Sequence, residues 1–233
     1  MIAMQKLLIL HGWGTDASVY ANLTEHLSQS YNVILPELPG FGATPEPPEP
    51  WGVSDYADYV LSLNIQPDIL LCHSLGCRIA IKLLSENKLN PTKVIFTGAA
   101  GIKPRRTTAQ KLKTRLFKLK KLFLKPFPKA LEKLRKKYGS ADYRNATPIM
   151  RASLIKIVNE DLTPLLPFVT HDLLLIWGEN DDSTPLSDGI LMESLMPNAG
   201  LARIKNAGHY AFLEQPALFN KILDSYFLIG GSK

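Results

Sequence analysis

The sequence predicts an α/β fold in which a mostly parallel sheet of about six strands carries helices on both faces. Six short runs are continuously apolar rather than alternating, which is typical of parallel strands covered on both faces. Helical stretches separate most of these runs, and the length of 233 residues suits one large domain with an insertion. Hydrophobic residues make up 45% and charged residues 21% of the chain, which is ordinary for a globular protein, and the content of 15 Gly and 17 Pro excludes a globally disordered or collagen-like protein.

The six strands follow directly from the apolar runs. They are expected at Lys6–Leu10, Asn32–Pro36, Asp68–His73, Lys93–Gly98, Asp172–Trp177 and Leu201–Lys205. Open α/β sheets place their sites at the carboxyl ends of the strands, so the side chains directly after each run are the first candidates for function.

Four helices are predicted between or after these strands. Ser54 is placed to cap a helix over Asp55–Asn64, and a second helix is expected at Leu75–Asn87. Helices at Pro185–Met196 and Pro216–Leu228 each begin with a proline, which the first turn of a helix tolerates.

The regular alternation stops in residues 101–167, where no strand pattern occurs. Three helical stretches fit this segment, at about 107–124, 129–138 and 147–159. We therefore predict an α/β core made of residues 1–100 and 168–233, interrupted by a strongly basic helical cap over residues 101–167.

The strand that ends at His73 leads straight into Ser74, Leu75 and Gly76. A nucleophilic serine needs such a sharp strand-to-helix turn, with small residues two positions before and after it. Cys72 and Gly76 hold those positions here. The alternative is an ordinary turn with a surface serine.

An acid and a histidine follow at the ends of later strands. Asp181 comes after the run that ends at Trp177, and His209 comes after the last run. The order Ser74, Asp181, His209 is that of a catalytic triad on a sheet of this kind, with Ser74 as nucleophile, His209 as base and Asp181 as its orienting acid. Asp182 is the competing carboxylate, and we favour Asp181.

The first strand ends in the segment HGWG at residues 11–14. A backbone N–H there, from Trp13, and the N–H of Leu75 are the candidate donors to a developing oxyanion. We expect His11 to shape this loop rather than to act as a base. The residues that flank the catalytic positions are the candidate lining of the substrate pocket: His11, Gly12, Phe41, His73, Tyr210 and Phe212.

Five motifs carry a resemblance to a known family. They are HGWG at 11–14, ELPGFGAT at 37–44, CHSLG at 72–76, GEND at 178–181 and GHYAFLEQP at 208–216. With them the chain resembles the α/β-hydrolases, in particular the compact HGWG-type serine esterases that include the pimeloyl-acyl-carrier-protein methyl ester esterases. The resemblance implies hydrolysis of carboxylic esters of small to medium acyl groups through an acyl-enzyme, a helical cap over the pocket, and no cofactor.

Three residues depart from the family pattern. Cys72 and Cys77 stand where glycine is usual, and Glu37 stands where aspartate is common. The two cysteines support neither a disulfide framework nor a structural zinc site, so we expect buried free thiols and no metal.

Related chemistries share the same triad, so several substrates stay open. The alternatives are a lactone, including an acyl-homoserine lactone, an acyl-carrier-linked ester or thioester, and a carbon–carbon bond. A non-catalytic binding protein is the alternative from another class, although it would have no need of all three triad residues.

The charge distribution sets the remaining expectations. Between Lys103 and Lys137 the chain has fifteen Lys and Arg residues and one acid, Glu132, whereas the rest carries twelve basic and twenty acidic residues. The basic cap could keep its lysines in water, dock an acidic partner such as an acyl carrier protein, or contact an anionic membrane. We expect no nucleic-acid partner, because no aromatic platform accompanies the charge. The start of the chain lacks a basic region and cleavage site, so we expect a cytoplasmic protein.

Overall fold

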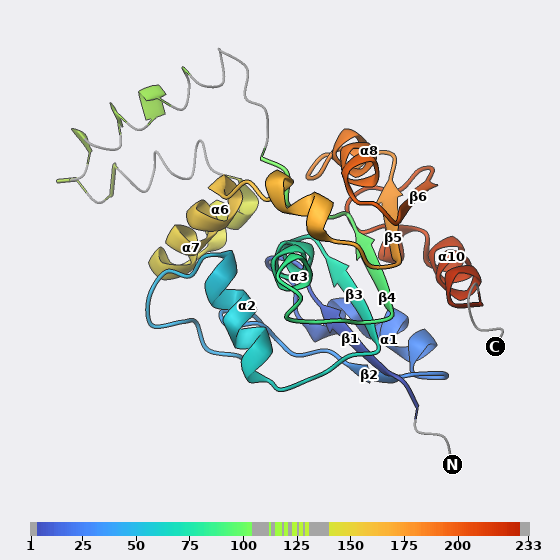
Figure 1. Cartoon of the computed structure of the whole chain (residues 1–233). Helices are drawn as coiled ribbons and strands as arrows, with labels where there is room; N and C mark the ends of the chain where they lie inside the picture. Colours follow the sequence, from blue (N-terminus) through green and yellow to red (C-terminus); the bar gives the residue numbers. More distant parts are fainter. Residues whose placement is uncertain are drawn as a thin grey trace.

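A computed structural model of the chain describes residues 4–103 and 140–228, together with residues 112, 115–117, 119, 120, 123, 124, 126, 127, 129 and 130. Its centre is a six-stranded sheet with the order β2-β1-β3-β4-β5-β6, in which every neighbouring pair is parallel. The predicted fold class is therefore confirmed. Figure 1 shows the sheet between two layers of helices.

The strands agree with the apolar runs to within one or two residues. They are β1 Lys6–Leu10, β2 Asn32–Ile34, β3 Ile69–His73, β4 Lys93–Thr97, β5 Leu173–Gly178 and β6 Ala199–Ile204. β6 begins two residues earlier than predicted, because Ala199 already pairs with Leu173 of β5.

Helices cover both faces of the sheet. One face carries α2 Val53–Ser62, α3 Leu75–Ser85, α8 Leu186–Leu195 and the 3-10 helix η2 Thr163–Phe168. The other carries the 3-10 helix η1 Ala17–Tyr20, α1 Ala21–Leu27, α9 Ala211–Glu214 and α10 Pro216–Leu228. Because both faces are buried, successive residues of a strand enter different cores: in β1, Leu8 and Leu10 pack on the α3 side, and Leu7 and Ile9 on the α1 side.

The start of α2 corrects one prediction. The helix begins at Val53, with Gly52 as its N-cap residue, so Ser54 lies inside the first turn instead of capping it. The Asp55 carboxylate accepts a hydrogen bond from the Gly52 N–H at 2.7 Å. An acid in the first turn also interacts favourably with the positive end of the helix dipole.

Most of the residues that the structure describes in 101–167 are helical. Helix α7, Pro148–Asn159, matches the stretch predicted at 147–159, and Thr147 caps it by accepting from the Met150 N–H at 3.2 Å. The short helix α6, Ala141–Asn145, was not predicted. The stretches predicted at 107–124 and 129–138 lie outside the described residues, apart from scattered positions.

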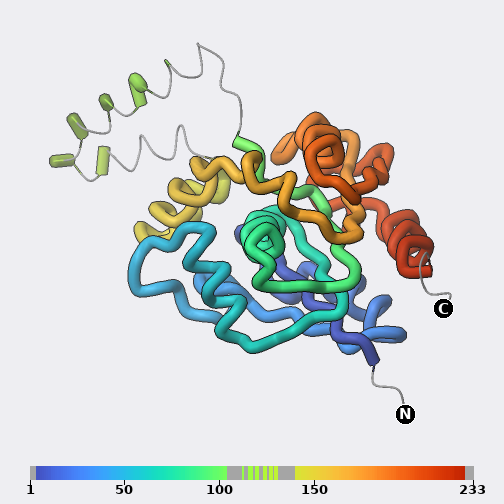
Figure 2. The backbone as a smooth tube through the Cα atoms, in the orientation of Figure 1, coloured from blue at the N-terminus to red at the C-terminus, as the bar shows by residue number. Residues whose placement is uncertain are grey.

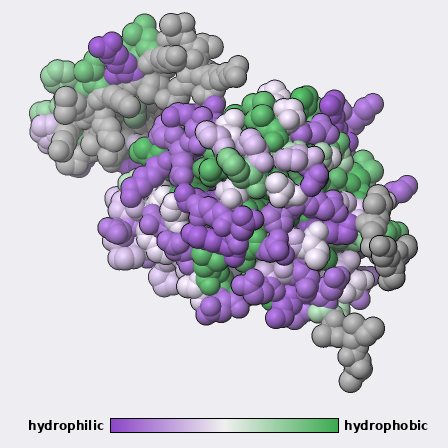
Figure 3. Space-filling model, in the orientation of Figure 1, coloured by the Kyte–Doolittle hydropathy of each residue, from purple (hydrophilic) through white to green (hydrophobic). Residues whose placement is uncertain are grey.

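Helix α7 lies beside α2, as both Figure 1 and Figure 2 show. The Trp51 N–H donates to Ser153 Oγ at 2.8 Å, and the side chains of Tyr56 and Met150 meet in the core. Most of the face drawn in Figure 3 is hydrophilic, with small hydrophobic patches. No helix among the described residues is both long and apolar enough to cross a membrane.

Candidate active site

Ser74 stands at a strained turn between β3 and α3. Its backbone has φ 49° and ψ −105°, a region that a residue with a side chain rarely adopts. Two hydrogen bonds to the neighbouring segment hold the turn: the Ser74 N–H donates to Thr97 O, and the Ala100 N–H donates to Ser74 O, each at 3.3 Å. A strained backbone that its surroundings enforce is a frequent property of functional sites.

Gly76 allows the turn to be this tight. A Cβ atom on Gly76 would lie 2.1 Å from the Leu10 carbonyl oxygen, so only glycine lets the first turn of α3 meet the end of β1. The Gly76 N–H also donates to His11 O at 3.1 Å, which ties α3 to the loop after β1. The small residue expected two positions after the nucleophile is therefore required by backbone packing.

Replacing Gly76 with alanine is expected to lower the free energy of unfolding by about 1–3 kcal/mol or more, because backbone must move to admit the methyl group. Urea denaturation measures the change. Gly200→Ala is the matched control, since a Cβ atom there meets nothing within 4 Å, and it should stay within about 0.5 kcal/mol of the wild type. Equal stabilities for the two variants would contradict the packing argument.

Asp181 and His209 are joined by a hydrogen bond at the carboxyl edge of the sheet. The distance from His209 Nδ1 to Asp181 Oδ2 is 2.8 Å, and the Asp181 side chain is fully buried, whereas 14% of the His209 side chain is exposed. This arrangement leaves Nε2 of His209 as the ring nitrogen that Asp181 does not engage. Asp182, the competing carboxylate, is exposed.

The Asp181 carboxylate is held ionised by its hydrogen bonds. Burial raises the pKa of Asp181, but donors from His209 and Thr184 together outweigh that effect, and the net pKa lies below its usual value. Oδ1 accepts from the N–H groups of Ser183 and Thr184 at 2.8 Å each, and Oδ2 accepts from Thr184 Oγ1 at 2.8 Å.

Two residues that were not predicted from the sequence hold this pair in place. Thr184 contacts Asp181 and also lies 3.3 Å from His209 Nδ1. Glu214 accepts from the N–H groups on either side of His209, from Gly208 at 2.7 Å and from Tyr210 at 3.2 Å. Thr184 lies three residues after the acid, and Glu214 lies inside the GHYAFLEQP motif, so both could have been found as local turn partners.

The two candidate oxyanion donors lie on segments that touch. The hydrogen bond from Gly76 to His11 places the HGWG loop against the start of α3, where Leu75 is the first helical residue. A Cβ atom on Gly12 would lie 3.3 Å from Ser74 Cβ, so the loop passes directly beside the serine. Within the described part of the chain, neither the Trp13 N–H nor the Leu75 N–H donates to a protein acceptor.

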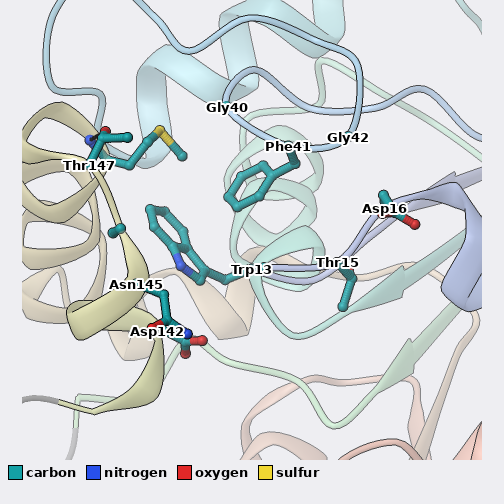
Figure 4. Close-up of a pocket in the computed structure, with 12 residues that line it drawn as sticks. Trp13, Thr15, Asp16, Gly40, Phe41, Gly42, Asp142, Asn145 and Thr147 are labelled. Carbon is teal, nitrogen blue, oxygen red and sulfur yellow. Dashed lines mark hydrogen bonds between the residues drawn. The ribbon is translucent and has the colours of Figure 1, made fainter.

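A cavity of about 350 Å³ opens beside this loop. Trp13 and Phe41 line it, and their rings meet edge to face at 4.9 Å. Figure 4 shows the Trp13 ring between Phe41 and the α6 residues Asp142 and Asn145. The rest of the lining comes from the loops that carry Trp13 and Phe41 and from the segment that leads from α6 into α7: Gly14, Thr15, Asp16, Gly40, Gly42, Ala146, Thr147 and Met150.

The other predicted pocket residues lie elsewhere. His11, His73 and Phe212 have buried side chains that belong to the core beneath the site, which corrects their expected place in the lining. Gly12 is also buried, against His73 and Ser74. Tyr210 is partly exposed and packs against His209, with ring centroids 5.3 Å apart, but it does not line this cavity.

His73 is a buried neutral histidine. Burial, reinforced by the nearby His209, lowers the pKa of His73 to about 3, although Asp181 acts in the opposite direction. Its Nδ1 lies 3.0 Å from the Thr97 carbonyl oxygen, so Nδ1 carries the proton, and its buried Nε2 has no hydrogen-bond partner among the described residues. The ring therefore serves as a packing element behind His209, at 4.7 Å between centroids.

This burial predicts a pH-dependent stability. The unfolded chain protonates His73 near its ordinary value of 6.5, whereas the folded chain resists protonation down to about 3. The free energy of unfolding should thus fall as pH falls below 6.5, by up to about 1.4 kcal/mol per pH unit. Urea denaturation of His73→Gln between pH 7 and pH 4 should show a shallower slope than the wild type. An unchanged slope would assign the effect to other groups, such as the buried His11, whose pKa burial also lowers.

The departures from the family pattern have structural explanations. Cys72 and Cys77 are buried free thiols, as predicted, and Cys77 Sγ donates to Cys72 O at 3.2 Å. Burial raises the pKa of both thiols, so they stay protonated at neutral pH. The Glu37 carboxylate accepts from the Ala43 N–H at 2.6 Å and so supports the loop that carries Phe41. Among the described residues, no group of three or more His, Cys, Asp or Glu could hold a metal ion.

Comparisons with known proteins agree with this architecture. Two curated relatives are pimeloyl-[acyl-carrier protein] methyl ester esterases: that of Nitrosospira multiformis is 26% identical, covering 91% of this chain and 90% of its own length, and that of Legionella pneumophila is 25% identical, covering 94% of each.

Two solved structures share the fold. An esterase from Exiguobacterium antarcticum matches with a TM-score of 0.72 at 22% identity, covering 95% of this chain and 91% of its own. The enol-lactonase from Burkholderia xenovorans matches with a TM-score of 0.72 at 19% identity, covering 97% and 92%. Residues 7–222 match the model of the alpha/beta hydrolase family. The chain therefore belongs to the alpha/beta hydrolase family.

Proposed function

We propose that the protein hydrolyses carboxylic esters through an acyl-enzyme formed on Ser74. The observation that carries the proposal is the 2.8 Å hydrogen bond between Asp181 and His209 at the sheet edge where Ser74 occupies its strained turn. The esterase names of the curated relatives support the same chemistry.

In this mechanism Ser74 Oγ attacks the ester carbonyl while His209 Nε2 takes its proton. The N–H groups of Trp13 and Leu75 stabilise the oxyanion of the tetrahedral intermediate. His209 then gives the proton to the alcohol oxygen, the C–O bond breaks, and the alcohol leaves. Water repeats the sequence on the acyl-enzyme and releases the acid, while Asp181 stabilises the charged imidazole in both halves.

We expect the cavity to hold the acyl group of the substrate, and its size and lining suit uncharged acyl groups of small to medium length. Its volume of about 350 Å³ and its Trp13–Phe41 wall suit an apolar chain. The described lining contains two carboxylates, Asp16 and Asp142, and no basic side chain, so a negatively charged acyl group would be repelled. Helices α6 and α7 contribute one wall, which supports a cap role for residues 101–167.

The names of the curated relatives favour a more specific substrate, an ester linked to an acyl carrier protein. The basic segment between Lys103 and Lys137 has the charge that an acidic carrier would require. Lactones, thioesters and carbon–carbon bonds remain alternatives, since the same acyl-enzyme steps cleave them.

A substrate panel tests the proposal. Wild-type protein is assayed with p-nitrophenyl esters from acetate to palmitate, with homoserine lactones and with an acyl-carrier-linked methyl ester, and a fluorophosphonate probe reports labelling of Ser74. We expect turnover of the short and medium esters together with labelling of Ser74. No turnover and no labelling would favour a binding protein. Turnover of the carrier-linked ester that falls with salt, beside salt-independent turnover of neutral esters, would support carrier docking.

A further inference from the structure

The carbonyl oxygen of Gly12 receives two side-chain hydrogen bonds. His11 Nδ1 lies 2.8 Å from it, and Thr15 Oγ1 donates to it at 2.9 Å. Both side chains are buried, with His11 fully enclosed and Thr15 7% exposed. This carbonyl belongs to the peptide unit whose N–H is that of Trp13, the candidate oxyanion donor.

The tautomer of His11 shows that its Nδ1–H donates to the Gly12 carbonyl oxygen. The Leu38 N–H donates to His11 Nε2 at 2.9 Å, so Nε2 is the acceptor nitrogen and the proton lies on Nδ1. Burial lowers the pKa of His11, in spite of opposing contributions from Gly12 and two acids, which keeps the ring neutral. The Gly12 oxygen thus accepts from two neutral donors.

The other side of Gly12 is held as well. Its own N–H donates to the hydroxyl oxygen of the fully buried Tyr20 at 3.0 Å. The two peptide units on either side of the Gly12 Cα are therefore both anchored to side chains. Figure 4 shows Thr15 and the Trp13 ring pointing in different directions from the same loop.

A peptide unit is planar, and in the trans form its N–H points opposite to its C=O. Fixing the direction of the Gly12 carbonyl therefore fixes the direction of the Trp13 N–H. Hydrogen bonds that a carbonyl accepts also polarise the peptide and strengthen its N–H as a donor.

We propose that Thr15 and His11 are positioning residues for the oxyanion site: their two hydrogen bonds to the Gly12 carbonyl hold the Trp13 N–H toward the reacting carbonyl. The inference rests on the proposed ester hydrolysis and deepens it. In this role each side chain acts through the peptide between Gly12 and Trp13, although Thr15 also contributes to the lining of the cavity.

Thr15→Val tests the proposal, because it removes the donor and keeps the branched shape. Loss of a direct oxyanion donor costs about 10²–10³ in kcat, so loss of one of two supports should cost about tenfold. KM should change less than about twofold, because the oxyanion exists only in the transition state. A trifluoromethyl ketone inhibitor, which forms the oxyanion on Ser74, should bind about tenfold more weakly.

Two further variants separate positioning from folding. Thr15→Ser keeps the hydroxyl and should restore kcat. Thr92→Val removes a hydroxyl that also donates to a backbone carbonyl, that of Asp68 at 2.9 Å, at the amino-terminal end of the sheet, and it should leave kcat unchanged. If Thr15→Val does not fold, Thr15→Ala replaces it in the comparison with Thr15→Ser.

The possible failures are distinguishable. An inactive wild type would overturn the proposed function and this inference with it. An active wild type with an equally active Thr15→Val variant would overturn the inference alone. A rise in KM without loss of kcat, or no rescue by Thr15→Ser, would give Thr15 a binding or packing role instead.

Discussion

Ser74→Ala is expected to lower kcat on a p-nitrophenyl ester by about 10⁴–10⁶-fold, with the protein still folded. The variant lacks the hydroxyl that forms the acyl-enzyme, while the residual rate comes from binding and from the oxyanion donors. Alanine replaces serine at the same backbone angles, φ 49° and ψ −105°, and the turn keeps its hydrogen bonds to Thr97 and Ala100, so stability should change little.

Steady-state kinetics measures kcat of the variant, and a thermal melt measures whether it is still folded. Ser85→Ala is the matched control, because Ser85 is the last residue of α3, the helix that follows Ser74, and its hydroxyl donates to Lys82 O at 3.1 Å. That variant should keep wild-type kcat. Retained turnover in Ser74→Ala, with a normal melt, would reject the acyl-enzyme mechanism.

Asp181→Asn is expected to lower kcat by about 10⁴-fold. The carboxylate accepts from His209 Nδ1 and so leaves Nε2 free to take the serine proton. In the variant, Ser183 and Thr184 still donate to Oδ1, which turns the amide nitrogen toward His209. An amide that donates to Nδ1 fixes the opposite tautomer, in which Nε2 carries a proton and cannot act as a base.

Asp182→Asn is the control for charge and position in the same loop. Asp182 is exposed, so its variant should retain kcat within about twofold. The comparison also decides between the two carboxylates that the sequence offers. Large losses in Asp182→Asn and none in Asp181→Asn would reverse the assignment of the acid.

Local patterns in the sequence were sufficient to predict the strands of the sheet and the residues that follow them at its carboxyl edge. Burial on both faces demands continuous apolar runs, so β1 and β3 to β5 could be located to within about one residue. Ser74, Asp181 and His209 each follow a predicted strand, so they were expected at one edge of the sheet. That placement needs only parallel topology, which the alternation of strands and helices implies.

Local patterns do not predict contacts between segments that are distant in the sequence. The lining of the cavity beside the HGWG loop depends on which aromatic rings the packing encloses: His73 and Phe212 are buried in the core, whereas Trp13 and Phe41 lie at the cavity. The N-cap residue of α2 is Gly52 rather than Ser54, and the Asp55 carboxylate in the first turn accepts from the Gly52 N–H, because the position of the first helical residue decides which side chain reaches that N–H group.

The sequence by itself determined the class of fold, the family and the order of the triad candidates, because periodicity and strand-end motifs are properties of neighbouring residues. Only the tertiary structure decided how the site is held. The bonds from Leu38 to His11, from Gly12 to Tyr20 and from Gly76 to His11 join residues that are 8 to 65 positions apart in the sequence. Their geometry depends on how helices and loops pack on the sheet, and no local pattern specifies that packing.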